Sequence, residues 1–356
     1  MDRPSAMDLQ GMLRCRMGWA QAEGPSHDVV LASRVRLARN LAGAAFPGRA
    51  KAATLRSVRE RVFAAARRSY LKDAAYLELE GYGEVDRMFL VERHLVSPAL
   101  AAEPGLGGAV VDTRECLNIM VNEEDHLRLF ALTPGLDLRE AARRADALDS
   151  ELSRDLDFAF RQDWGYLTAC PTNLGTGMRA SVLVHLAGLG LGGYINKLLE
   201  SLPRAGLIAR GLHGEGTKVM GDFFQISNAT GLGRSEAELA AAVETAVETL
   251  VRRENEARGK LGGGTGRTRL EDAVYRAIGA LTGARLLSFA EACHHLSALR
   301  LGLSLGWEVP GDFGTVNELM IMTQPAHLAM LAGKLLSVED QAVLRASLVR
   351  RRLAGK

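Results

Sequence analysis

Five arginines and three glutamates stand beside turns and strand ends in this sequence, where their side chains can meet a ligand. Arg34 and Arg36 lie two residues apart in a strand-like run, so their side chains face the same side. Guanidinium groups form forked hydrogen bonds with phosphate oxygens and stay charged at neutral pH, so a cluster of them suits a phosphate clamp. Any one of them alone would be a surface residue with a solvated head. The five are Arg34, Arg36, Arg128, Arg179 and Arg210.

Three carboxylates accompany these arginines. Glu123 and Glu124 belong to the acidic run before Arg128, and Glu215 follows Arg210 in a glycine-rich stretch. A short acidic run is usually a solvated turn. Beside a phosphate clamp, however, spare carboxylates need another use, and binding a cationic substrate is the natural one. The residues therefore predict a site for one anionic and one cationic ligand.

Two glycine-rich stretches are similar to nucleotide-binding loops. Gly188–Gly193 satisfies G-x-G-x-x-G between an apolar run and a helix-like segment, the context of a dinucleotide-binding turn. The acidic residue expected after the next apolar run is missing, since Arg210 stands near that position. A dinucleotide enzyme is therefore the weaker alternative to a tight strand-to-helix loop. The second stretch, 262–268, has Arg267 where a phosphate-binding loop needs lysine, and we interpret it as a linker.

Composition excludes several classes of protein. The chain has 356 residues with 44 basic and 42 acidic side chains, a net charge of +2, whereas a DNA-coating protein needs a basic excess. Its four cysteines have no C-x-x-C spacing, which argues against a zinc site and a disulfide scaffold. The N-terminus lacks the apolar stretch of a signal peptide, and no segment reaches the ~18 apolar residues of a membrane span. We expect a cytoplasmic protein that contacts neither membrane nor nucleic acid directly.

Apolar spacing predicts the elements that position these residues. We expect strands at 28–41, 85–97, 109–121, 165–170, 180–186 and 223–228, and helices at 51–70, 137–161, 193–202 and 236–257. Beyond the basic, glycine-rich stretch 258–269 the pattern is helical to residue 356. Mixed strands and helices followed by helices alone predict an α+β domain and a helical domain.

A longer motif connects these residues to a known family. Cys170–Gly177, with the sequence CPTNLGTG, resembles the signature of the ATP:guanido phosphotransferases, or phosphagen kinases. Four further runs appear in the family's order. They are SRVRLARN (33–40), NEEDHLRL (122–129), RGLHGEG (210–216) and FQISN (224–228).

Within this family, the chain is most similar to the bacterial protein-arginine kinases of the McsB type. Small-molecule phosphagen kinases carry a helical N-terminal domain, and SRVRLARN begins too early, at residue 33, to leave room for it. The segments LEDAVYR, LRLGLSLG and NELMIMTQP of the tail are also similar to the McsB type. The resemblance implies an α+β catalytic domain, with an antiparallel sheet flanked by helices, followed by an all-helical C-terminal domain. The expected divisions are a helical lead-in at 1–24, the catalytic domain at 25–257, a glycine-rich linker at 258–269 and the helical domain at 270–356.

The resemblance implies that ATP donates its γ-phosphoryl group to an arginine guanidinium in a protein, with Mg²⁺ bound through the nucleotide and not by side chains. Free arginine or another small guanidino compound is the alternative substrate. Catalytic roles are implied for Glu123, Glu124, Glu215 and Cys170. Nucleotide contacts are implied for Ser33, Arg34, Val35, Arg36, Leu37, His94, Arg128, Arg179, Ala180, Ser181, Val182, Leu183, Arg210, Gly211, Leu212, His213, Gly214 and Glu215.

Cys170 has two interpretations. A lone cysteine is most often a buried, inert residue. The resemblance instead implies a reactive cysteine beside the substrate nitrogen, and the glycine-rich turn that follows it favours this interpretation.

The last helix departs from the McsB type, whose R-D-x-x-R-A motif binds phosphoarginine. The aligned residues run Gln341-Ala-Val-Leu-Arg345-Ala346, so only the final two positions match and regulation by phosphoarginine is not expected to be intact. The resemblance also implies protein substrates that present arginine, a McsA-like activator, a CtsR-type repressor, a Clp unfoldase, a role in stress response or degradation, and a homodimer through the helical domain. A non-catalytic adaptor is a further alternative.

Overall fold

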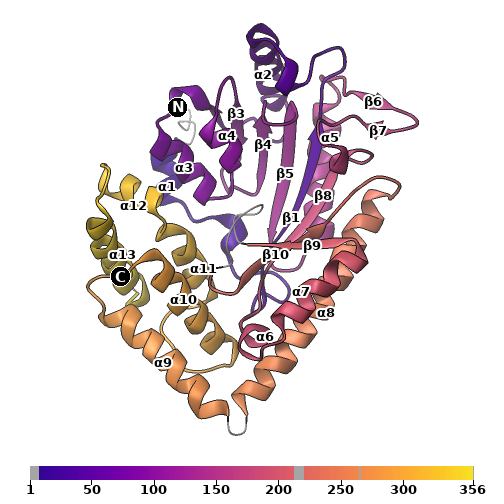
Figure 1. Cartoon of the computed structure of the whole chain (residues 1–356). Coiled ribbons are helices and arrows are strands. Elements are labelled where there is room, and N and C mark those ends of the chain that lie inside the picture. The colour runs from indigo at the N-terminus through magenta and orange to yellow at the C-terminus, as the bar shows by residue number, and fades with distance from the viewer. Residues whose placement is uncertain (1–7, 212–219, 264–265, 356) are drawn as a thin grey trace.

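The computed structural model describes residues 8–211, 220–263 and 266–355, and these form an eight-stranded antiparallel sheet with helices on both faces (Figure 1). The strand order is β2-β3-β4-β5-β1-β8-β10-β9, so β1 and β8, which carry arginine motifs, are neighbours inside the sheet. A separate hairpin, β6-β7, projects from the body (Figure 1). The strands are β1 (Val30–Arg39), β2 (Ala75–Glu78), β3 (Gly108–Val111), β4 (Leu117–Val121), β5 (Leu127–Pro134), β6 (Phe160–Arg161), β7 (Gly165–Tyr166), β8 (Met178–His185), β9 (Leu207–Arg210) and β10 (Phe223–Asn228).

One face of the sheet is covered by α2 (Ala52–Ala66), α5 (Leu138–Leu152) and α8 (Glu236–Gly262). The apolar residues of α5 recur every three or four positions and are buried against Val35 and Leu129 of the sheet. This is the spacing that predicted the helix, although it ends at Leu152 instead of 161.

The opposite face is shared by two groups of helices. Near β2, β3 and β4, a core that contains Trp19, Phe89 and Phe130 packs beneath α1 (Leu9–Arg14), α3 (Glu84–Glu92) and α4 (Pro98–Ala102). Near the other end of β1 and β10, Leu31 and Phe223 pack against the C-terminal helices. These are α9 (Arg267–Gly283), α10 (Phe289–Ser304), α11 (Phe313–Met322), α12 (Pro325–Ala332) and α13 (Val338–Leu353), and α6 (Ala187–Leu191) and α7 (Ile195–Ser201) lie between β8 and β9 in the chain.

A buried carboxylate joins the catalytic part to the tail. Glu92, at the end of α3, accepts hydrogen bonds from the backbone N–H groups of Ala326 and His327 at the start of α12, each at 2.8 Å. The Nδ1 of His327 lies 2.8 Å from the same carboxylate. Arg93, the next residue, forms a buried ion pair with Glu115 and lies 3.4 Å from Nε2 of His327. This arrangement fixes α12 against α3.

Three predicted strands are wrong in extent or type. The segment 85–97 begins as the helix α3, because the backbone N–H of Gly83 donates to Asp86 and the apolar residues that follow pack at helical spacing. The segment 109–121 is a hairpin, β3 and β4, because Glu115 adopts a left-handed conformation (φ 59°) that turns the chain. The predicted strand at 165–170 is reduced to the two residues of β7.

The predicted linker 258–269 is mostly helical. Helix α8 continues to Gly262, and α9 begins at Arg267. Arg258 explains the continuation: it is buried, forms an ion pair with Glu254 one turn earlier, and donates to the carbonyl oxygen of His185 at 3.2 Å. The antiparallel sheet with flanking helices and the helical C-terminal region are confirmed.

The glycines of the G-x-G-x-x-G stretch lie in and next to α6 and serve packing. The carboxylate of Glu254 accepts the N–H groups of Gly188 and Leu189 at 2.7 and 2.9 Å. It therefore occupies the helix N-terminus at which a dinucleotide would place its phosphates. Across the described residues, every helix is too short or too polar to cross a membrane.

Candidate active site

A cavity of about 570 Å³ opens over the sheet and brings most of the predicted site residues together. All five predicted arginines line it, as do Glu123, Glu124 and Cys170. Its other lining residues were partly unpredicted. They are Val91, His94, Val96, Ser97, Pro98, Ala99, Met120, Thr172, Asn173, Ser181, Ile208, Gln225, Ser227 and Ala229.

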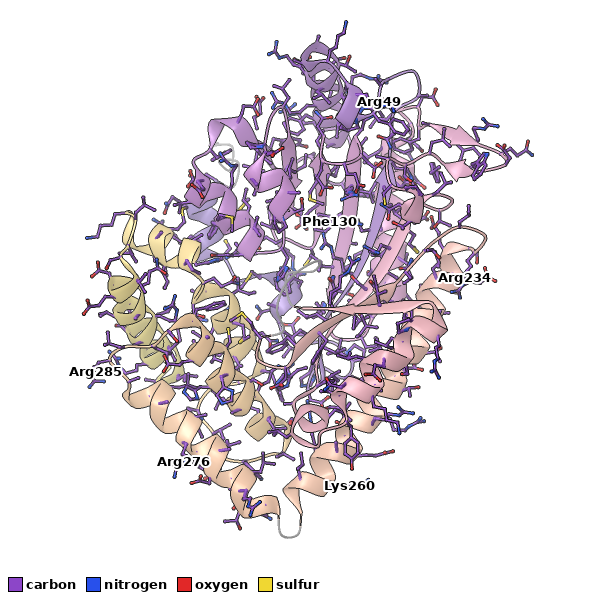
Figure 2. The ribbon with its side chains drawn as sticks, viewed as in Figure 1. Arg49, Phe130, Arg234, Lys260, Arg276 and Arg285 are labelled. Atoms are coloured by element: carbon purple, nitrogen blue, oxygen red, sulfur yellow. The ribbon has the colours of Figure 1, made fainter. Side chains whose placement is uncertain are left out.

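Strand register explains why the arginines converge. Arg36 on β1 is directly opposite Arg179 on β8, and Arg34 is opposite Ser181. Opposite residues of an antiparallel pair point to the same face of the sheet, and alternate residues along each strand share that face. On the other neighbour, Arg36 is opposite Phe130 of β5, which lies near the middle of the molecule in Figure 2.

Alternation sends the intervening residues of the motifs to the other face. Val35, Leu37, Ala180 and Val182 are buried in the core under α5 and α8, so their side chains do not reach the cavity. Ser33 is also buried there, and its hydroxyl donates to the carbonyl oxygen of Gly135 at 2.8 Å.

The remaining predicted nucleotide contacts do not share one location. His94 lines the cavity with a left-handed backbone (φ 62°), and its ring packs edge-on against Trp19 with centroids 5.4 Å apart. Leu183 lines a small hollow next to His94 and Arg34. Gly211 follows β9 and is buried outside the cavity lining. Leu212, His213, Gly214 and Glu215 lie outside the described residues.

Arg34 and Arg36 are held in a low-dielectric setting. Arg34 stacks on Phe130 with its Cζ 4.0 Å from the ring centroid, and its Nε finds no hydrogen-bond partner among the described residues. Burial lowers the pKa of Arg34 to about 10. Burial, followed by repulsion from Arg128, Arg34 and Arg179, lowers the pKa of Arg36 to about 9. Both guanidinium groups remain charged at neutral pH, so an anionic ligand would relieve their repulsion.

Arg128 stands between this cationic region and the carboxylates. Its guanidinium pairs with Glu123 and with Glu124, and its Nε lies 3.5 Å from Asp125. Burial alone would lower the pKa of Arg128, but the three carboxylates raise it above the ordinary value. The two glutamates differ in solvent exposure: the side chain of Glu123 is 8% exposed and that of Glu124 is 45% exposed.

Asp125 links this acidic turn to the signature loop. One of its oxygens accepts hydrogen bonds from the side-chain amide of Asn40 and from the backbone N–H of Ala169, both at 2.7 Å. Ala169 precedes Cys170, whose Sγ lies 3.0 Å from the hydroxyl of Thr172. The fully buried Asp125 therefore sets the position of the cysteine loop relative to Arg128.

Sequence reasoning missed several residues of the cavity. Ser97 donates to Glu123 at 2.6 Å, and Gln225 and Ser227 extend the polar face from β8 to β10. The alternation of FQISN could have identified the latter two, since Gln225 and Ser227 are two residues apart. Ser97-Pro98 has the pattern of a helix start, which signals a cap and not a site.

Two family models match the chain. The C-terminal catalytic domain of the ATP:guanido phosphotransferases matches residues 57–257, and the C-terminal domain of the protein-arginine kinase McsB matches residues 267–356. The protein-arginine kinase of Halothermothrix orenii is 42% identical over 348 residues, which are 98% of this chain and 99% of that protein. That of Moorella thermoacetica is 45% identical over 341 residues, 95% and 97% of the two chains.

Solved structures agree with this relationship. Lombricine kinase has a TM-score of 0.58 at 25% identity, with 72% of each chain covered. The duplicated taurocyamine kinase of Schistosoma mansoni, with bound transition-state analogue components, has a TM-score of 0.59 at 26% identity. That likeness covers 76% of this chain, which spans about two fifths (39%) of the duplicated protein. From the catalytic-domain match over more than half of its length and the full-length similarity to curated relatives, this chain belongs to the ATP:guanido phosphotransferase family.

Proposed function

We propose that the protein is a protein-arginine kinase, which transfers the γ-phosphoryl group of ATP to arginine side chains in proteins. The observation that carries the proposal is the division of the cavity. Arg34 and Arg36 line it without an ion pair or hydrogen bond to a carboxylate among the described residues, while Glu123 and Glu124 both pair with Arg128. One region suits a polyphosphate and the other a guanidinium.

On the nucleotide side, three arginines from two adjacent strands offer forked donors to phosphate oxygens. Arg34, Arg36 and Arg179 are fixed by the sheet register, so they bind without reorganising the backbone. Phosphoryl transfer depends mainly on alignment and on stabilising charge on the oxygens, which such a preformed cluster provides. Mg²⁺ carried by the nucleotide supplies further neutralisation of that charge.

On the substrate side, carboxylates must orient a weak nucleophile. A guanidinium is protonated at physiological pH because its pKa lies above ~12. In the transfer, one guanidinium nitrogen forms a bond to the γ-phosphorus, the bond from that phosphorus to the bridging oxygen breaks, and its electron pair leaves on ADP. The nitrogen's proton passes to a carboxylate. We assign the orienting carboxylates to Glu124, from its exposure at the cavity, and to Glu215, from the sequence alone.

The cavity wall next to the carboxylates favours protein-bound arginine over the free amino acid. This wall is formed by Val96, Ser97, Pro98, Ala99 and Met120, and none of them is charged. Free arginine carries an α-carboxylate that would need a cation at this position. An arginine side chain of a protein carries no such group, so an uncharged wall suits it better.

Mass spectrometry for acid-labile phosphoarginine tests the proposal. The wild type should phosphorylate an arginine-rich protein with release of ADP, and should act only weakly on free arginine. Glu124→Gln and Glu215→Ala should each lose more than about 100-fold in turnover while ADP still binds. Glu103→Gln, an exposed glutamate away from the cavity, should match the wild type. Faster turnover of free arginine would support the small-molecule alternative, and absence of ADP release with any substrate would support the adaptor.

We also infer several cellular properties from the family resemblance alone. They are a cytoplasmic location, a role in stress response or protein degradation, a McsA-like activator, a CtsR-type repressor, a Clp unfoldase and a homodimer through the helical domain. Co-purification of the tagged protein with such partners would test them, and a single chain without partners in a stressed cell would contradict them.

A further inference from the structure

Ser97 holds one of the two adjacent carboxylates of the cavity. Its Oγ lies 2.6 Å from Oε1 of Glu123, and it also caps α4 by accepting the N–H of Leu100 at 3.1 Å. Ser97 itself lines the cavity, so this contact lies within the site.

The two contacts fix the direction of the hydroxyl proton. A serine hydroxyl has one proton to donate and two lone pairs. The N–H of Leu100 occupies a lone pair, and an ionised carboxylate can only accept, so the proton of Ser97 points at Glu123. The other oxygen of Glu123 pairs with Arg128. Both oxygens of Glu123 are therefore held by the protein.

The carboxylate of Glu124 is less constrained by protein contacts than that of Glu123. Arg128 is its partner among the described residues, and its side chain is 45% exposed, against 8% for Glu123. We propose that Ser97 is a positioning residue: it holds Glu123 on Arg128, so that Arg128 keeps one carboxylate partner when Glu124 turns from it onto the guanidinium substrate. This inference rests on the proposed function, because it takes Glu124 as a substrate-binding carboxylate.

Three substitutions of Ser97 separate positioning from helix capping. Glycine caps a helix almost as well as serine, whereas alanine costs ~1 kcal/mol, and neither can donate to Glu123. Threonine can both cap and donate. Ser288→Ala is the matched control, because Ser288 caps α10 in the same way and does not line the cavity.

For positioning, we expect Ser97→Gly and Ser97→Ala to lose kcat equally, by about tenfold, with KM for ATP within about twofold of the wild type. Ser97→Thr should restore most of the turnover, and Ser288→Ala should keep all of it. The midpoint of thermal unfolding should fall in Ser97→Ala and stay nearly constant in Ser97→Gly. Wild-type kcat in Ser97→Gly would reduce Ser97 to a helix cap and overturn the proposal.

A crystal structure of Ser97→Gly tests the same inference without turnover. The Glu123 carboxylate should leave its position beside residue 97 and its pairing with Arg128 should loosen. An unchanged Glu123 would overturn the positioning role. If the wild type phosphorylates no guanidino substrate, the proposed function fails, yet this structural comparison still decides whether Ser97 holds Glu123.

Discussion

Two groups of arginines are shielded from solvent in this protein, fully in the helical tail and partly in the cavity, and they differ in what surrounds the guanidinium. In the helical tail, Arg300 donates to two backbone carbonyl oxygens and one side-chain amide, and Arg345 donates to two carbonyl oxygens. In the cavity, the Arg34 guanidinium stacks on a phenyl ring, and the Arg36 guanidinium has neither a hydrogen bond nor an ion pair with another described residue.

Burial acts on both groups alike. It lowers the pKa of Arg300 and of Arg36 to about 9 each. The difference lies in what compensates the lost hydration: the protein's own carbonyl groups do so for Arg300, and a ligand must do so for Arg36. A buried arginine alone is therefore no sign of a site, whereas a partly buried arginine whose guanidinium lacks protein acceptors indicates where an anion binds.

Arg36→Met gives the largest expected effect and tests the ligand half of this comparison. Removing a guanidinium that stabilises the transferring phosphoryl group should lower kcat/KM by at least ~10³-fold. The midpoint of thermal unfolding should hold or rise, because the substitution ends repulsion from Arg34, Arg128 and Arg179. Arg285→Met, in the exposed tail (Figure 2), is the control and should change neither quantity. Retained activity with lowered stability would place Arg36 in the structural group.

Arg345→Met tests the other half of the comparison, the arginines of the helical tail that are held by backbone carbonyl groups. It leaves the carbonyl oxygens of Thr323 and Leu287 without their donor, so the free energy of unfolding measured in urea should fall by about 3 kcal/mol. Turnover per folded molecule should stay at the wild-type level. Gln341→Ala, one turn earlier on α13, removes one partly exposed hydrogen bond to the carbonyl oxygen of Leu336 and should cost no more than ~1 kcal/mol. A stable Arg345→Met that loses a response to added phosphoarginine would show that this arginine still serves a ligand.

The smallest expected effect concerns His185, a buried histidine close to Arg258 and Arg300. Burial, together with the charges of Arg300 and Arg258, holds the pKa of His185 well below its ordinary value. Below about pH 6.5 this histidine is therefore protonated in the unfolded chain and neutral in the folded protein. The free energy of unfolding then falls by ~1.4 kcal/mol for each pH unit by which the solution is made more acidic. In His185→Gln, the free energy of unfolding measured in urea should depend less on pH between pH 7 and 5.5 than it does in the wild type. An equal slope in both proteins would contradict the assignment.

The arginines of the site could be predicted because motif and alternation act together. Arg34 and Arg36 share a face by period two, and pairing with β8 adds Arg179 to it. The same alternation rules out side-chain contacts by Val35 and Leu37, which the motif as a whole had included. A family motif identifies the strand as a whole, whereas the alternation of side chains along the strand determines which of its residues face the ligand.

Other features depend on contacts between distant segments and could not be predicted. The segment 85–97 is β-rich in composition, yet its partner is α12, some 230 residues later, and packing against it favours a helix. The sequence around Ser97 indicates only a helix cap, because the contact between Ser97 and Glu123 forms only when the chain has folded. Asp125 likewise gains its partners Asn40 and Ala169 from separate loops.

The Glu92–His327 contact makes the tail and the catalytic part a matched pair, with consequences for protein engineering. A tail exchanged from a relative would leave the Glu92 carboxylate buried without its donors unless it also supplied the equivalent of Ala326, His327 and their helix start. Domain exchange within this family should therefore succeed when α3 and α12 travel together, and the compatibility of two parents can be judged from the residues that face each other across that junction.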